Sequence, residues 1–200
     1  KSNDVFEEAF IFATNGTELS TEWSKSIINE CNKIKRDISA QDIDSRKDLR
    51  SLNFVTIDGS NAKDFDDAVF AEENSDGYLL YVAIADVSEY VLQDSSLDKE
   101  ALSRATSVYF EKKVIPMLPE LISNKLCSLR PNEDKLVLTC EIYLDGEGEI
   151  KSYEFFNSVI CSKNRLTYDE VEKFYQKGQT ALSDDIVSNL NALKKIHALR

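Results

Sequence analysis

Short apolar runs separated by turn residues recur through the middle of the chain and are typical of β-strands. Residues 54–57 and 68–71 are two such runs, and they flank the acidic stretch 58–67. The turn sequence NSDG then leads into residues 78–85, a continuous apolar run suited to a central strand. This pattern predicts a hairpin that carries the acidic stretch at the entrance of its first strand.

A second hairpin is predicted by residues 136–144 and 150–156, which flank the turn sequence DGEG. Two shorter runs, residues 106–109 and 114–117, bracket a charged tip at residues 111–113. These segments add further antiparallel strand pairs to the expected sheet.

The N-terminal part is less regular. Residues 6–12 (FEEAFIF) predict a strand without a nearby partner. Helical spacing of apolar residues predicts a helix over residues 21–36, with Thr21 as its N-cap. Trp23 lies on the apolar face of this helix, where packing explains it better than stacking on a nucleic-acid base.

Three further helices are expected, the first over residues 97–104. Thr167 and Gly178 are typical start and stop residues for a helix over 168–176, and Ser183 begins a last helix. Hairpins mixed with scattered helices predict an α+β fold with a mixed or antiparallel β-sheet and packed helices.

Composition allows one sizeable core, because the 200 residues are 42% hydrophobic. The chain has neither a run of about 18 apolar residues nor a signal-peptide pattern, so we expect no membrane association and a cytoplasmic location. Cys31, Cys127, Cys140 and Cys161 are far apart and form no CxxC pair, which argues against a zinc site or a disulfide framework.

The net charge of −12 is unusual for a protein that binds nucleic acid, since such domains are usually basic. All of the excess lies in residues 1–98, which hold 9 Lys and Arg against 21 Asp and Glu. Residues 64–98 contain no Lys or Arg, whereas residues 99–135 are mildly basic. An acidic, solvated surface explains most of this charge.

Asp58, Asp64, Asp66 and Asp67 place four carboxylates within residues 58–67. A close pair of like charges costs roughly 1 kcal/mol in water and about 4 kcal/mol at an effective dielectric of 20. A bound cation would relieve this repulsion. Carboxylate oxygens without a nearby His or Cys select Mg²⁺, Mn²⁺ or Ca²⁺ rather than zinc.

A calcium-binding EF-hand starting at Asp58 would need an oxygen ligand, Gly and Glu where the chain has Ala62, Lys63 and Val69. The spacing excludes that motif. Two interpretations remain open on spacing alone. One is a magnesium site that holds one ion and shares a second with a substrate phosphate. The other is an acidic turn without a metal.

The segment FVTIDGSNAKDFDDAV, residues 54–69, resembles the catalytic signature of the ribonuclease II / ribonuclease R (RNB) family, and within it the bacterial ribonuclease R branch. The four family aspartates fall on Asp58, Asp64, Asp66 and Asp67. Further blocks match in the same order: VAIADVSEYV at 82–91, SSLDKEALSRATSVYF at 95–110, VIPMLPELISNKLCSLRP at 114–131 and NRLTYDEV at 164–171.

This resemblance implies a hydrolytic, processive exoribonuclease that digests RNA from its 3′ end and releases nucleoside 5′-monophosphates. It implies that the aspartates hold Mg²⁺, with Mn²⁺ as a substitute, and that Asp66 is the most critical for the chemical step. It also implies that Tyr109 stacks on the bases at the single-stranded RNA 3′ end, although packing would be the default explanation for that residue taken alone.

The family organisation implies that residues 1–20 are the tail of an upstream OB-like (cold-shock) region and that residues 21–45 are a linker helix. Residues 46–200 would be the N-terminal portion of an RNB-type catalytic domain, with an S1 domain further downstream. The chain would then be a fragment that lacks the family's transition-state arginine. Glu89 departs from the family pattern, which commonly has His there.

Two other functions stay open at this stage. A non-catalytic RNA-binding relative would keep the fold without turnover. A simple Mg²⁺- or Ca²⁺-binding module would bind metal but no RNA.

Overall fold

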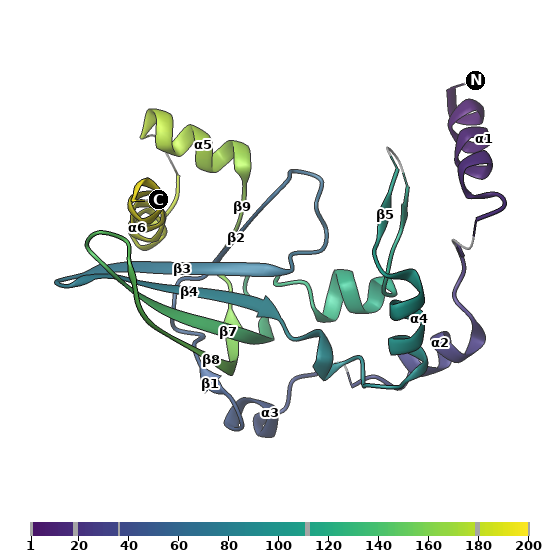
Figure 1. Ribbon diagram of the computed structural model, residues 1–200, viewed down its shortest axis with the longest axis horizontal. Helices are drawn as coiled ribbons and strands as arrows, with labels where there is room; N and C mark the ends of the chain where they lie inside the picture. The colour runs from purple at the N-terminus through teal and green to yellow at the C-terminus, as the bar shows by residue number, and fades with distance from the viewer. Residues whose placement is uncertain (1, 18–19, 36, 111–112, 179–180, 200) are drawn as a thin grey trace.

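The computed structural model describes residues 2–17, 20–35, 37–110, 113–178 and 181–199, with side chains from Glu7 onward. A seven-stranded sheet forms its centre, in the order β1-β8-β7-β4-β3-β2-β9 (Figure 1). Its strands are β1 (Lys47–Asp48), β2 (Val55–Asp58), β3 (Asp67–Asn74), β4 (Gly77–Ala85), β7 (Asp134–Asp145), β8 (Ile150–Cys161) and β9 (Asn164–Thr167).

Most neighbouring strands in this sheet are antiparallel, because β3–β4 and β7–β8 are hairpins joined by short turns. The edge pairs β1–β8 and β2–β9 are parallel. Strands β5 (Val108–Tyr109) and β6 (Val114–Ile115) form a separate two-stranded hairpin, whose tip at residues 111–112 lies outside the described residues. The predicted α+β class with a mixed, mainly antiparallel sheet is confirmed.

Helices cover both faces of the sheet. The helical segments are α1 (Ser2–Thr14), α2 (Lys25–Cys31), α3 (Ala40–Asp44), η1 (Val87–Glu89), α4 (Ser96–Arg104), η2 (Ile122–Leu126), α5 (Tyr168–Lys177) and α6 (Asp184–Ala198). In Figure 1, α5 and α6 lie above the sheet and α3 lies below it. Thr167 and Ser183 are the N-caps of α5 and α6, and Gly178 ends α5 in the left-handed conformation, as predicted.

The N-terminal predictions need correction. Residues 6–12 lie inside helix α1 and not in a strand. Phe10 packs on Phe110 with ring centroids 4.9 Å apart, so this apolar side chain has a partner although the segment is not in a sheet. The helix predicted from Thr21 is also shorter, because Ser24 is the N-cap and α2 ends at Cys31. Arg36, its predicted end, lies outside the described residues.

Two apolar cores meet at the sheet. Phe54, Phe70 and Tyr81 form an aromatic group on one face of the sheet, in a core that also includes Ile27 of α2 and Leu97 of α4. The opposite face packs against α5 and α6 through a smaller cluster: Val55, Leu166, Phe174, Ile186 and Leu190. Phe54, just before β2, belongs to the first core, and Val55 and Ile57 of β2 pack in the second, so the chain is held on both faces of the sheet just before Asp58.

Candidate active site

The acidic stretch is the loop that joins β2 to β3. Asp58 is the last residue of β2 and Asp67 the first of β3, so the sheet places both carboxylates. Asp64 and Asp66 lie in the irregular segment between them. Asp67 is opposite Ile84 in the register with β4, so the loop meets the sheet beside the end of that strand.

Groups distant in sequence, a serine hydroxyl and two backbone amides, hold the second half of this loop. Ser128, which is fully buried, accepts a hydrogen bond from the Phe65 amide at 3.1 Å and donates one to the Lys63 carbonyl at 3.1 Å. The Leu129 amide donates to the Phe65 carbonyl at 2.8 Å. The Ala85 amide donates to the Asp66 carbonyl at 2.9 Å. The backbone on both sides of Asp64 and Asp66 is therefore fixed by the protein core.

The carboxylates themselves have few partners. In the part of the chain that the structure describes, no Lys or Arg side chain forms an ion pair with Asp58, Asp64, Asp66 or Asp67. Loss of solvent around Asp66, followed by repulsion from Asp64, Asp67 and Asp58, raises the pKa of its carboxyl. The unbalanced negative charge makes the loop attractive to a cation.

Partial burial also raises the pKa of Asp58, and the charge of Asp67 adds to that rise. Arg165 acts in the opposite direction and Asp64 in the same one. The carboxylates at the two ends of the loop therefore act on one another electrostatically, as a single acidic cluster.

The donor set fits a hard cation, since it offers only carboxylate oxygens. Among the described residues, however, no group of three or more His, Cys, Asp or Glu side chains converges closely enough to hold an ion. Asp58 and Asp67 on the strands and Asp64 and Asp66 in the loop are near one another without a finished coordination geometry. Binding of an ion would require these side chains to move inward.

Tyr109 lies next to the acidic loop. It belongs to β5, and its hydroxyl donates a hydrogen bond to Asp64 Oδ2 at 3.3 Å. The side chain is 67% exposed, so packing does not account for it. Partial burial and the Asp64 carboxylate raise the pKa of Tyr109.

A cavity of about 260 Å³ opens between Tyr109 and the loop. Asp64 and Asp66 supply its acidic wall. Apolar and small side chains supply the rest: Ile84, Ala85, Val87, Ser107, Met117, Leu118, Ile122, Ser123 and Cys127. An exposed aromatic ring, a hollow and an acidic wall thus occur side by side.

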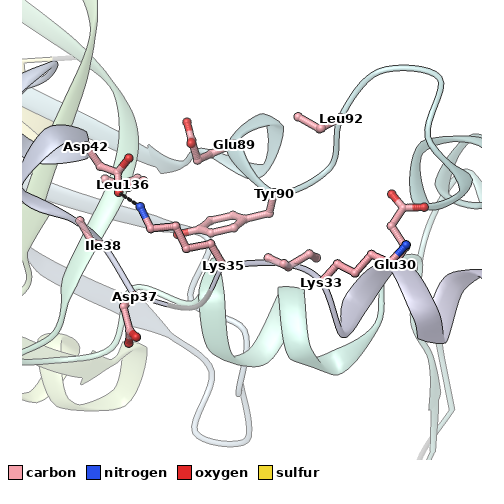
Figure 2. A pocket seen from close by; sticks show the side chains of 11 residues that line it. Glu30, Lys33, Lys35, Asp37, Ile38, Asp42, Glu89, Tyr90, Leu92 and Leu136 are labelled. Atoms are coloured by element: carbon pink, nitrogen blue, oxygen red, sulfur yellow. Dashed lines mark hydrogen bonds and ion pairs between the residues drawn. The ribbon is translucent and has the colours of Figure 1, made fainter.

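A second cavity, of about 280 Å³, lies away from the acidic loop, beside α2, α3 and η1 (Figure 2). None of the four aspartates lines it. Two of its own acids, Asp42 and Glu89, are paired with Lys35 at 2.7 Å and Arg46 at 2.9 Å. Glu89, the departure from the family pattern, is therefore neutralised away from the candidate site.

Sequence reasoning missed two residues that hold the loop. Ser128 and Arg165 lie within matched blocks, but only the three-dimensional structure shows that they contact the acidic loop. A buried serine and a strand arginine carry no local signal of that role, because the residues that they bind are more than 60 positions away.

The fold and the loop define an α+β domain that carries four neighbouring aspartates at one end of its sheet. The RNB domain matches residues 46–200, so the chain belongs to the RNB family. The chain is 46% identical over 184 residues to ribonuclease R of Buchnera aphidicola, covering 87% of this chain and 25% of that relative. It therefore spans about a quarter of that relative's length.

Solved structures agree. Mycoplasma genitalium RNase R in complex with double-stranded RNA is similar with a TM-score of 0.88 and 35% identity, over 96% of this chain and 34% of that one. The same enzyme with ribose-methylated single-stranded RNA gives 0.87. Yeast Ssd1, a pseudonuclease, shares the fold with a TM-score of 0.69 at 21% identity, over 82% of this chain and 20% of that one. No helix in the described part of the chain is long and apolar enough to cross a membrane.

Proposed function

We propose that this chain is part of a Mg²⁺-dependent, hydrolytic 3′-to-5′ exoribonuclease that releases nucleoside 5′-monophosphates. One observation carries the proposal: four aspartates at the family signature positions have no ion-pair partner among the described residues, and an exposed tyrosine lies beside them. Membership of the RNB family and similarity to ribonuclease R support RNA as the substrate.

The residues of this chain have distinct roles in that reaction. Asp58, Asp64, Asp66 and Asp67 would hold the metal, and when bound, two such ions activate a water and stabilise the leaving oxygen. Hydrolysis breaks the bond between phosphorus and the 3′ oxygen, so the phosphate leaves with the terminal nucleotide. Tyr109 would stack on a base near the 3′ end, a contact that tolerates any sequence because every base has a π-face.

The chain spans only part of its relatives, so the proposed enzyme includes more than these residues. We place OB-type domains before the catalytic domain and an S1 domain after it, and these would add positive charge for RNA binding. We assign residues 1–20 to the upstream region and residues 46–200 to the first part of the catalytic domain. The four free cysteines are compatible with a cytoplasmic location.

The test is RNA hydrolysis by the full-length protein. Asp66→Asn should lower kcat by at least about 100-fold, the loss expected when a group that stabilises transition-state charge is removed. Asp145→Asn is a matched control, since Asp145 is a carboxylate at the other end of the same sheet. Release of 5′-nucleotides by Asp66→Asn at the wild-type rate would contradict the proposed role.

The incomplete convergence of the carboxylates supports a second candidate, an RNA-binding protein without turnover. In that case the full-length protein should bind oligo(A) in EDTA and leave it uncut with Mg²⁺. A metal-binding module would show Mg²⁺ affinity and no gel shift with oligo(A). The same two assays therefore separate all three functions.

A further inference from the structure

Arg165 is a cation close to the acidic loop that does not pair with any of its carboxylates. It lies in β9, where the parallel register places it next to Thr56, two residues before Asp58. Its Nη2 donates hydrogen bonds to the carbonyl oxygens of Gly59 at 2.8 Å and Ser60 at 2.9 Å. A single guanidinium, from a neighbouring strand that is distant in sequence, therefore fixes the start of the loop.

The same side chain reaches the other half of the loop. The guanidinium carbon of Arg165 lies 5.5 Å from the centre of the Phe65 ring, within the range of a cation–π contact. The Gly59 carbonyl also accepts a hydrogen bond from the Ala62 amide at 3.1 Å, so Arg165 supports the turn that begins the loop. Arg165 thus links residues 59–60 to residue 65 across the acidic stretch.

The position is costly for the protein. Arg165 Nε and Thr56 Oγ1 are both buried without a hydrogen-bond partner among the described residues, and they belong to paired positions on neighbouring strands. An unsatisfied buried donor costs about 1–3 kcal/mol. A lysine or an apolar residue at position 165 would avoid the buried Nε, so the guanidinium is retained for what it does at the loop.

We infer that Arg165 is a positioning residue, which holds the loop backbone for cation binding while leaving all four carboxylates free of a permanent ion pair. Its hydrogen bonds go to main-chain carbonyls, so its charge offsets the acidic loop without occupying a ligand oxygen. This inference rests on the proposed function, because it concerns the same metal site. Arg165 acts through the loop and need not touch RNA.

Mn²⁺ binding to the full-length protein tests the inference, with Arg165→Met and Arg165→Lys as variants. Met keeps the apolar stem and should weaken Mn²⁺ affinity about 10-fold, the scale of losing an outer-shell partner. Lys keeps the charge but not the planar guanidinium, and should weaken it about 3-fold. Arg50→Met is the matched control, since Arg50 pairs with Asp48 and Asp134 on the surface.

Hydrogen exchange in EDTA gives a second readout that needs no metal. Arg165→Met should speed exchange of the Ala62 amide about 10-fold, and the turn at residues 145–149 should not change. A merely structural arginine would lower the melting temperature and leave Mn²⁺ affinity unchanged, and that result in a folded variant overturns the inference. If Met does not fold, wild-type affinity of Arg165→Lys overturns it equally.

The two proposals fail in different ways. If the wild-type chain binds no Mn²⁺, the metal site of the proposed function fails, and unchanged exchange at Ala62 then decides against Arg165 separately. If the wild type binds Mn²⁺ and Asp66→Asn does not, the metal site stands. An unaffected Arg165→Met then removes only the positioning role.

Discussion

Two acidic stretches lie at opposite ends of the same sheet, and their carboxylates are treated in opposite ways. The loop of residues 58–67 meets the sheet where Asp67 is opposite Ile84, at the end of β4. The turn between β7 and β8 begins at Asp145, opposite Gly77 at the start of β4 (Figure 1). Both stretches are acidic in sequence, yet only the turn pairs its first aspartate with a basic side chain among the described residues.

Asp145 is satisfied by its own turn. Its Oδ1 accepts hydrogen bonds from the amides of Glu147 at 3.0 Å and Glu149 at 2.9 Å, and Lys151 forms an ion pair with it at 2.6 Å. The Lys151 ammonium and then these amides hold the pKa of Asp145 below its usual value. This carboxylate stabilises a turn and has no need of a bound metal ion.

Asp58 and Asp66 are the opposite case, since partial burial and their acidic neighbours raise the pKa of both. Core groups hold the loop backbone, and the side chains are left to repel one another. A protein keeps such an arrangement at a cost to stability when the site serves binding or catalysis. The contrast separates an acid that stabilises a turn from acids left without an ion pair, as the proposed function requires.

The largest expected difference between the two stretches is in metal affinity. Asp66→Asn should weaken Mn²⁺ binding by about 100-fold, because a ligand oxygen matters at least as much as the outer-shell partners that cost ~10–100-fold when lost. Asp145→Asn should leave the dissociation constant unchanged. Isothermal titration with Mn²⁺ measures both, and equal losses in the two variants would abolish the distinction.

RNA binding should differ next. Tyr109 and Tyr153 are almost equally exposed, at 67% and 66%, but only Tyr109 lies beside the acidic loop. Tyr109→Ala should weaken binding of a single-stranded oligonucleotide about 10-fold, within the ~1–3 kcal/mol of one stacked base. Tyr109→Phe and Tyr153→Ala should bind as the wild type does. Fluorescence anisotropy in EDTA makes the comparison without turnover, and a loss with Tyr153→Ala would contradict it.

The sequence predicted the structure of the turn but not the contacts that hold the acidic loop, for a physical reason. The DGEG turn and the ends of α5 depend on residues within a few positions of each other, and the structure has them as expected. The bonds from Ser128, Leu129 and Arg165 to the acidic loop span more than 60 positions, and no local pattern reveals them.

Helix α1 is a case in which a local pattern led to a wrong prediction. The aromatic and β-branched residues of FEEAFIF suggest a strand, but a strand needs a partner and the described structure provides none for residues 6–12. Glu7 instead pairs with Lys113 at 2.7 Å, and Phe10 packs on Phe110. Tertiary contacts with the β5–β6 hairpin therefore accompany a helix where local propensity alone favoured a strand.

Thermal stability should respond with opposite signs at the two stretches. In EDTA at neutral pH, Asp66→Asn removes repulsion and should raise the melting temperature by about 2 °C, since ~1 kcal/mol shifts a domain of this size by 2–4 °C. Asp145→Asn weakens an ion pair and two amide contacts and should lower it slightly. Calorimetry of both variants checks the signs. A lower melting temperature for Asp66→Asn would mean that its carboxylate is satisfied after all.

The smallest expected effect is the pH dependence of the melting-temperature changes in Asp66→Asn and Asp145→Asn. The raised pKa of Asp66 means that its contribution to stability is fully present below the unfolded pKa of about 4 and is lost as pH rises through the folded value. The higher melting temperature of Asp66→Asn relative to the wild type should therefore approach the wild-type value as pH falls from 7 toward 4.

The lowered pKa of Asp145 has the opposite consequence, because its contribution to stability is present above about pH 4 and is lost only below it. The melting temperature of Asp145→Asn should thus stay below that of the wild type down to about pH 4. Melting curves in EDTA between pH 7 and 4 measure both differences from the wild type. The contrast would be contradicted if both differences disappeared over the same pH range.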